Sequence, residues 1–282
     1  ISVVTPPACL PTALASASNL TATSADLSWT ASTSAPANGY LWEVRTSGAG
    51  GSGPTGLVDN GTTAAGVTTA STTALASNTT YTLYVHSDCG SGTSTWTGSA
   101  AFTTPCTASD VPYTEDFNSV TAPALPSCTS KQTISGFDWT TTSGPMTGMS
   151  GNAAYNYGYN NTGAGMSSWL FTRGVNLTAG TSYQLSYKYG NPYTFYTDAM
   201  AVAYGTSPSD AAMTNPLHEY TAINDGVTHL DSATIVPATS GVYYFGFKRE
   251  APSSNYGYYL EVDDISVILT PACYSPAAST YI

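Results

Sequence analysis

The chain has 282 residues, of which only 8% are charged, and its 17 acidic and 6 basic side chains give a net charge of -11. This acidic balance excludes a nucleic-acid or anionic-membrane partner, because such binders need a basic face to neutralise phosphates. No apolar run approaches the roughly 20 residues that span a bilayer. Since 21 Tyr and 5 Trp supply the apolar mass that a disordered chain lacks, we expect about two globular domains.

The first predicted domain, residues 5–105, consists of short strands in which apolar and polar side chains alternate. The pattern is visible at Leu27-Ser28-Trp29 and at 40–44, and it is most regular at 81–85. Helical periodicity is absent. His86 continues the last strand on its outward face, so we expect a solvated histidine at that position.

These strands resemble those of a fibronectin type III domain. Leu27-Ser28-Trp29 is similar to the second strand with its core Trp, 40–44 to the third strand, and 78–85 to the corner Tyr and the sixth strand. Phe102-Thr103-Thr104-Pro105 completes the match. The resemblance implies a β-sandwich. It does not imply integrin binding, because the Arg-Gly-Asp tripeptide is missing.

The second predicted domain, residues 106–270, also consists of alternating strands and opens with 113–117. The later strands share an alternation of aromatic or aliphatic residues with polar ones: 168–171, 183–189, 198–205, 242–248 and 258–267. So many strands favour a two-sheet jelly roll. The sequence therefore predicts an all-β chain, with a fibronectin type III-like β-sandwich followed by a jelly-roll β-sandwich.

The order of these strands, which ends in an Asp-Asp strand directly before Pro-Ala-Cys, resembles jelly-roll modules of the MAM and cleaved-adhesin type. Such modules follow fibronectin-like modules in surface proteins and secreted proteases of Bacteroidetes. The resemblance implies a secreted or cell-surface protein that is exported by type IX secretion.

The two ends of the chain carry similar sequences. Ile265 to Cys273 matches Ile1 to Cys9 at six of nine positions without a gap, at an offset of 264 residues. We therefore expect a tandem repeat of 264 residues, whose neighbouring copies are its partners. Residues 1–4 would close a preceding repeat, and 271–282 would begin the next fibronectin type III-like domain.

Four of the five cysteines fall within one period, and they allow three connectivities. We favour Cys9 with Cys89 and Cys106 with Cys128, because each pair then lies within one predicted domain. Cys273 is the counterpart of Cys9 in the next repeat. Disulfides imply an oxidising, extracellular compartment.

No catalytic residue is predicted. The three histidines form no metal-binding pair at helical spacing, and neither a Gly-x-Ser-x-Gly turn nor a phosphate loop ending in Lys is present. Cysteine catalysis would need a thiolate that the disulfides remove. Paired carboxylates could hydrolyse a glycoside, but the best candidates for such a pair have another use.

These candidates are Glu115, Asp116, Asp263 and Asp264, which lie on the first and last strands of the second domain. In a jelly roll the two strands can be neighbours, so the carboxylates could share a Ca²⁺ ion, which takes about six to eight oxygen ligands. The resemblance also implies a structural calcium. The alternative is that strand alternation turns Glu115 and Asp263 to solvent while the other two cap turns.

A second candidate feature is a set of tyrosines in loops rich in Gly and Asn. The members that we expect to contact a glycan are Tyr155, Tyr157, Tyr159, Tyr193 and Tyr196. Aromatic rings pack against the C–H faces of sugars while neighbouring amides bind hydroxyls. The alternative is core or sheet packing, because strand spacing turns half of such residues inward.

Asp231-Ser232-Ala233 matches the pattern that Bacteroidetes use for O-glycosylation, and we expect Ser232 in an exposed connection before the 242–248 strand. Two functions remain. The first is a stalk and adhesion segment of a repeat adhesin, which contacts surface glycans or host and substratum proteins. The second is a carbohydrate-binding accessory region of a secreted hydrolase or protease.

Overall fold

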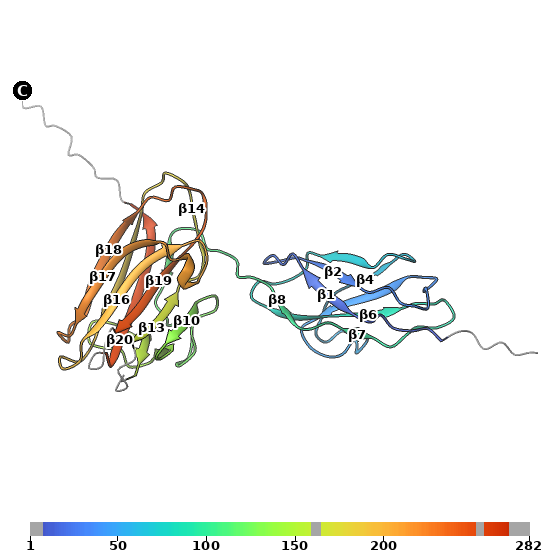
Figure 1. Ribbon diagram of the computed structural model, residues 1–282, viewed down its shortest axis with the longest axis horizontal. Helices are drawn as coiled ribbons and strands as arrows, with labels where there is room; N and C mark the ends of the chain where they lie inside the picture. The colour runs from blue at the N-terminus through green and yellow to red at the C-terminus, as the bar shows by residue number, and fades with distance from the viewer. Residues whose placement is uncertain (1–7, 159–164, 252–256, 271–282) are drawn as a thin grey trace, which may run out of the picture. The chain divides into compact units, whose positions relative to one another are not determined.

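The computed structural model describes residues 8–158, 165–251 and 257–270, so the predictions for residues 1–4, Tyr159 and Cys273 lie outside it. The chain divides into two compact units, Ile1–Thr107 and Ala108–Ile282. Both are built from strands (Figure 1), and the one helical element in the described ranges is a 3-10 turn, η1 (Asp210–Ala212). No helix in those ranges is long and apolar enough to cross a membrane.

The first unit is a β-sandwich of two antiparallel sheets. One has the order β1-β2-β5 and the other the order β4-β3-β6-β7, with β8 also paired to β6. The strands are β1 (Ala15–Ser18), β2 (Ala25–Trp29), β3 (Tyr40–Arg45), β4 (Leu57–Thr63), β5 (Thr69–Thr72), β6 (Thr80–Ser87), β7 (Thr97–Gly98) and β8 (Phe102–Thr103).

Alternation places the predicted core residues of this unit between its sheets. Trp29 of β2 packs edge to face against Tyr40 of β3, with ring centroids 5.7 Å apart. The Tyr81 hydroxyl accepts a hydrogen bond of 2.7 Å from the Ala76 N–H, which fastens β6 to the chain before it. The prediction for His86 is wrong: its side chain is only 8% exposed and stacks on Trp96 at 4.0 Å.

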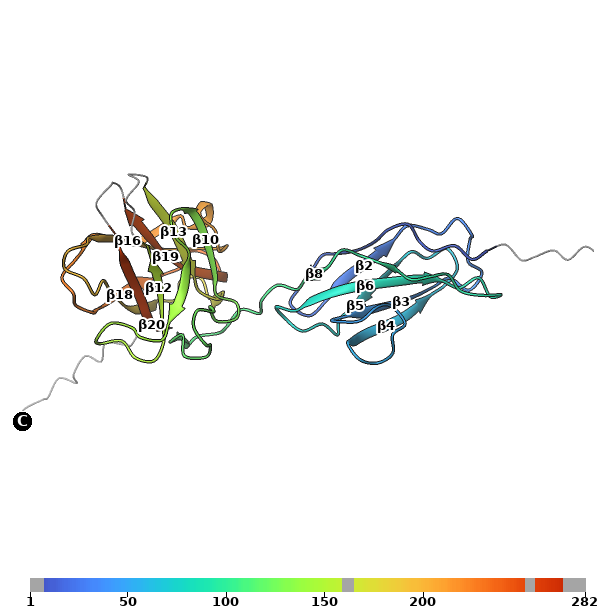
Figure 2. The same ribbon diagram turned by 90° about the horizontal axis from the view of Figure 1, so that it is seen from below.

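The second unit is a larger sandwich, whose two sheets Figure 2 shows from another side. The β16 sheet has the order β10-β13-β19-β16-β17, with β14 also paired to β19. Its strands are β10 (Ser130–Ser135), β13 (Met166–Phe171), β14 (Val175–Leu177), β16 (Asp198–Gly205), β17 (Asn215–Ile223) and β19 (Gly241–Ala251).

The opposing β20 sheet has the order β11-β12-β20-β15-β18, with β9 also paired to β20. Its strands are β9 (Tyr113–Glu115), β11 (Trp139–Thr142), β12 (Ala153–Tyr157), β15 (Tyr183–Gly190), β18 (His229–Ile235) and β20 (Tyr259–Leu269). The fold class predicted from the sequence, an all-β chain of two sandwiches, is therefore confirmed.

The core of the second unit lies between these sheets. Its members are the inward residues of the alternating strands, among them Leu185, Tyr187, Met200, Val202, Phe245, Phe247, Leu260, Val262, Ile265 and Val267. On β20 two residues, Asp263 and Asp264, stand between inward Val262 and inward Ile265. Asp264 has φ +47°, and the pairing with β15 shifts at this point. The strand therefore contains a β-bulge, which turns Asp263 to the outer face.

Cys9 and Cys89 form a disulfide with Cα atoms 5.8 Å apart, which joins the start of the first unit to the end of β6. Cys106 and Cys128 are also disulfide-bonded. Bonded cysteines of this kind belong to proteins of oxidising, extracellular compartments.

Candidate ligand-binding site

The structure gathers four of the predicted glycan-contact tyrosines on one surface of the second unit. These four come from β12 and from the loop between β15 and β16, and Tyr258 and Tyr259 at the start of β20 lie beside them. Rings of neighbouring members lie 4.8 to 6.4 Å apart. We call this set the tyrosine cluster: Tyr155, Tyr157, Tyr193, Tyr196, Tyr258 and Tyr259. The last two are not among the tyrosines that the sequence predicts as glycan contacts.

Much of the cluster is open to solvent. Tyr157 is 49% exposed, Tyr193 is 40% exposed, and Phe195 in the same loop is 93% exposed. The hydroxyls of Tyr157 and Tyr258 lie 3.0 Å apart, and this hydrogen bond raises the pKa of Tyr258 to about 12. The Tyr258 hydroxyl therefore stays neutral at physiological pH, and tyrosine hydroxyls can both donate and accept hydrogen bonds.

A buried ion pair lies directly behind the cluster. Arg249 Nε donates to Asp198 Oδ1 at 2.7 Å, and both side chains are fully buried. Asp198 Oδ2 accepts hydrogen bonds from the backbone N–H groups of Tyr258 and Tyr259 at 3.1 and 3.2 Å. Arg249 also donates to Asn156 Oδ1 at 2.7 Å, between the two tyrosines of β12. Burial lowers the pKa of Arg249, and the Asp198 carboxylate opposes that shift.

Asn191 extends this network to the loop that carries the remaining tyrosines. Its Nδ2 donates to Asp198 Oδ2 at 2.9 Å and to the Tyr196 carbonyl at 3.0 Å, while its Oδ1 accepts from the Tyr193 N–H at 2.9 Å. Every segment of the cluster is therefore fixed by one buried polar network, which we call the Arg249 network (Arg249, Asp198, Asn156 and Asn191).

Sequence reasoning missed the Arg249 network, although a signal for it exists. Arg249 follows Phe245 and Phe247 at the next inward position of β19, and Asp198 precedes Met200 and Val202 on β16 in the same way. Opposite charges at two inward positions predict a buried ion pair, because neither charge could be buried alone.

The predicted convergence of four carboxylates on one ion is wrong. Glu115 pairs with Ile265 across β9 and β20, so its side chain lies on the core side of the sheet, whereas Asp263 pairs with Lys188 and lies on the outer face. Asp264 forms an ion pair of 2.8 Å with Lys188, and Asp116 accepts a 3.0 Å hydrogen bond from the Asn118 N–H in a turn.

Within the described residues no group of three or more His, Cys, Asp or Glu side chains could hold a metal ion. Calcium binding therefore stays a prediction, and the described residues contain no cluster of three or more such side chains that supports it. Asp263 is nevertheless unusual, because its buried Oδ2 has no hydrogen-bond partner among the residues that the structure describes. Burial, together with the neighbouring Asp264 carboxylate, raises the pKa of Asp263 to about 7.

Ser232 lies within β18 at the edge of the β20 sheet, not in the connection predicted for it. It pairs with Ser186 of β15, and its exposed hydroxyl lies 3.4 Å from Gln184 Nε2. The alternation that turns Ala233 inward turns Ser232 to solvent. Its glycosylation stays a prediction.

No protein-family model and no curated protein matches the chain. The K1 cleaved adhesin domain of Lys-gingipain from Porphyromonas gingivalis W83 has 17% identity and a TM-score of 0.46, over 57% of this chain and 99% of that domain. The K3 domain of the same protein has 17% identity and a TM-score of 0.43, over 55% of this chain and 97% of that domain.

A structure of carbohydrate-binding modules from the β-sandwich superfamily has 13% identity and a TM-score of 0.36, over 93% of this chain and all of that one. These scores are too low to carry an argument, so the conclusions about fold rest on the strands and their pairing.

Proposed function

We propose that this chain is a segment of an extracellular adhesion protein, in which the second unit binds glycans through the tyrosine cluster. The observation that carries the proposal is the convergence on one surface of tyrosine rings from three separate parts of the sequence, of which Tyr157 and Tyr193 are exposed. A core-packing role would not leave Tyr157, Tyr193 and Phe195 between 40% and 93% exposed.

The chemistry of this surface suits a sugar. Exposed ring faces can pack against the C–H groups of a pyranose, and tyrosine hydroxyls can form hydrogen bonds with its alcohols. A negatively charged chain would repel a polyanion, whereas a neutral sugar is indifferent to that charge.

Rigidity supports the same proposal. Because the Arg249 network fixes the backbone of each tyrosine segment, little conformational entropy remains to be lost when a ligand binds. A preformed surface is what weak, repeated contacts with glycans require, since each contact contributes little affinity by itself.

The first unit is proposed as a fibronectin type III-like spacer. Its sheets β1-β2-β5 and β4-β3-β6-β7, its Tyr81 corner and its Cys9–Cys89 bond support that assignment. Repetition of the two-domain period along a longer protein would present many copies of the tyrosine cluster. The accessory region of a secreted hydrolase would use the same surface, so both functions share one binding test.

That test is an array of immobilised animal, plant and microbial oligosaccharides probed with the whole chain. We expect binding that falls about three- to tenfold in Tyr157→Ala and again in Tyr193→Ala, because each removes one ring face. Val236→Ala, which changes an apolar residue that is 54% exposed elsewhere on the unit, is the matched control. Binding that is equal in all four proteins would exclude the cluster as the glycan site.

A further inference from the structure

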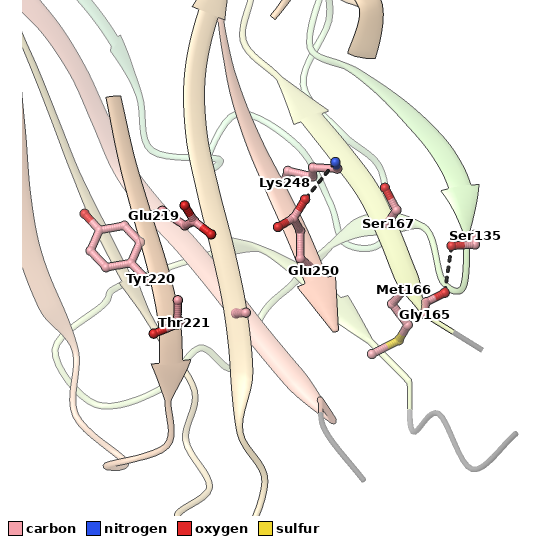
Figure 3. A pocket seen from close by; sticks show the side chains of 10 residues that line it. Ser135, Gly165, Met166, Ser167, Glu219, Tyr220, Thr221, Lys248 and Glu250 are labelled. Carbon is pink, nitrogen blue, oxygen red and sulfur yellow. Dashed lines mark hydrogen bonds and ion pairs between the residues drawn. The ribbon is translucent and has the colours of Figure 1, made fainter. Parts of the chain in front are cut away.

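A groove of about 700 Å³ lies on the outer face of the β16 sheet, away from the core (Figure 3). Ala199 of β16 lies at its centre, with Glu219 and Thr221 of β17 on one side and Lys248 and Glu250 of β19 on the other. A volume of this order is typical of sites that hold small ligands.

A second hollow of about 440 Å³ continues the groove along the same face. It shares Glu219, Lys248 and Glu250 with the first and is lined by Ala201 and Ala203. Alternate residues of β16 are thus alanines on the outer face, while Met200 and Val202 point into the core. The floor therefore consists of the methyl groups of Ala199 and Ala201 between polar side chains, whereas Ala203 is buried with Trp169 and Met213 at the apolar end of the groove.

The walls of the groove offer both acceptors and a donor. Lys248 Nζ lies 2.7 Å from Glu250 Oε1 and 5.4 Å from the centroid of the Trp169 ring, so this ammonium is held in place. Glu219 is exposed across β16 from that pair, and within the described ranges its carboxylate makes no side-chain hydrogen bond or ion pair. An occupant would therefore meet a carboxylate on each side and one ammonium.

An extended peptide does not fit this groove well. β16 is paired with β17 on one side and with β19 on the other, so its backbone N–H and C=O groups are already used, and a peptide cannot add as a further strand. Two carboxylates against one ammonium also disfavour an anionic ligand. A sugar hydroxyl can donate to a carboxylate and accept from an ammonium, while sugar C–H faces suit the alanine floor.

We propose that this groove is a second glycan site, which takes an extended oligosaccharide lying over Ala199 and Ala201. The hydroxyls of this oligosaccharide bind Glu219 on one side and the Lys248–Glu250 pair on the other. The ligand class rests on the proposed function, but the residues are different, because no member of the tyrosine cluster lines the groove.

The test is isothermal titration of the whole chain carrying Tyr157→Ala and Tyr193→Ala, which weaken the tyrosine cluster but leave the groove unchanged, with three soluble probes: cellohexaose, chitohexaose and mannohexaose. We expect at least one hexasaccharide to bind. Ala201→Phe, which fills the groove, should abolish that binding, and Glu219→Ala should weaken it about tenfold, the loss of a hydrogen bond to a charged group. Ala179→Phe adds the same ring at an exposed alanine of a turn outside the groove and should leave binding unchanged.

Glu219→Ala removes an exposed side chain that has no side-chain partner in the described part of the chain, so this variant should fold normally even if Ala201→Phe does not. Binding that survives both changes, or the failure of all three hexasaccharides to bind, overturns the groove site. If the hexasaccharides bind the unaltered chain but not the chain with both tyrosines replaced, the groove site is wrong and the proposed function stands. If binding is lost in the groove variants while Tyr157→Ala and Tyr193→Ala do not change binding to the array, the groove site stands and the tyrosine cluster is not the glycan site.

Discussion

Replacing Arg249 by methionine should strongly destabilise the second unit. The substitution keeps most of the side-chain volume but leaves the fully buried Asp198 carboxylate without its 2.7 Å partner. Removing one member of a buried ion pair costs about 3–5 kcal/mol, because an uncompensated charge remains in the interior. That is a large fraction of the roughly 5–15 kcal/mol that stabilises a typical domain.

Differential scanning calorimetry of the whole chain is the appropriate assay, because the two units can be followed as separate transitions. For a domain of this size about 1 kcal/mol corresponds to about 2–4 °C, so the transition of the second unit should fall by about 6–20 °C. Lys248→Met, on the same strand, is the matched control. It removes two partly exposed ion pairs, with Glu250 and with Asp210, each worth about 1 kcal/mol at most.

A second variant distinguishes the effect of the Arg249 network on the stability of the second unit from its effect on the position of the tyrosines. Combining Arg249→Met with Asp198→Leu removes both charges, and buried pairs replaced by apolar residues often regain stability. Glycan binding by the tyrosine cluster should nevertheless stay weak, because Tyr258 and Tyr259 lose the acceptor of their backbone N–H groups. A fall of less than about 1 kcal/mol in Arg249→Met would refute the network as a stabilising element, since surface substitutions produce effects of that size.

Three further outcomes are expected. Because the pKa of Asp263 is raised to about 7, the folded protein holds a proton that the unfolded chain releases near pH 4, so stability should fall as pH rises between these values. Asp263→Asn should flatten that slope and raise stability at pH 8 by at most about 4 kcal/mol in urea titrations, and an unchanged slope would contradict the assignment. Replacing Cys9 and Cys89 by serine should cost the first unit about 4–5 kcal/mol by calorimetry, and reducing agent should add nothing further to that unit. Gly39→Ala should lower the same transition by several degrees, because Gly39 has φ +83° and an added Cβ would lie 1.9 Å from the Thr63 carbonyl oxygen; an unaltered melting temperature would mean that the turn rearranges.

The sequence predicts most of the strands because each strand has its own alternation of apolar and polar residues. Trp29, Tyr40 and Tyr81 alternate with polar residues, and the structure buries all three. The same reasoning fails for His86, because alternation gives the face of a side chain but not what covers that face. Trp96, which follows in the chain and stacks on the histidine, makes the outer face of β6 a buried one at that point.

Predictions about groups of side chains depend on register, which the sequence does not contain. A single bulge at Asp264 places Asp263 and Glu115 on opposite faces of the sheet. Their strands are paired, but the two carboxylates do not converge. The tyrosine cluster was predictable only in part. Its members alternate on β12 and crowd into one loop, but their meeting with Tyr258 depends on a sandwich that brings three segments together.

The Arg249 network leaves the tyrosine positions free to accept substitutions during evolution. The network forms its hydrogen bonds with main-chain atoms of these segments: the N–H groups of Tyr193, Tyr258 and Tyr259 and the carbonyl of Tyr196. Main-chain atoms are the same whatever residue occupies the position. The outward side chains can therefore be exchanged, and the glycan specificity proposed for this surface changed, without loss of the hydrogen bonds that position the backbone.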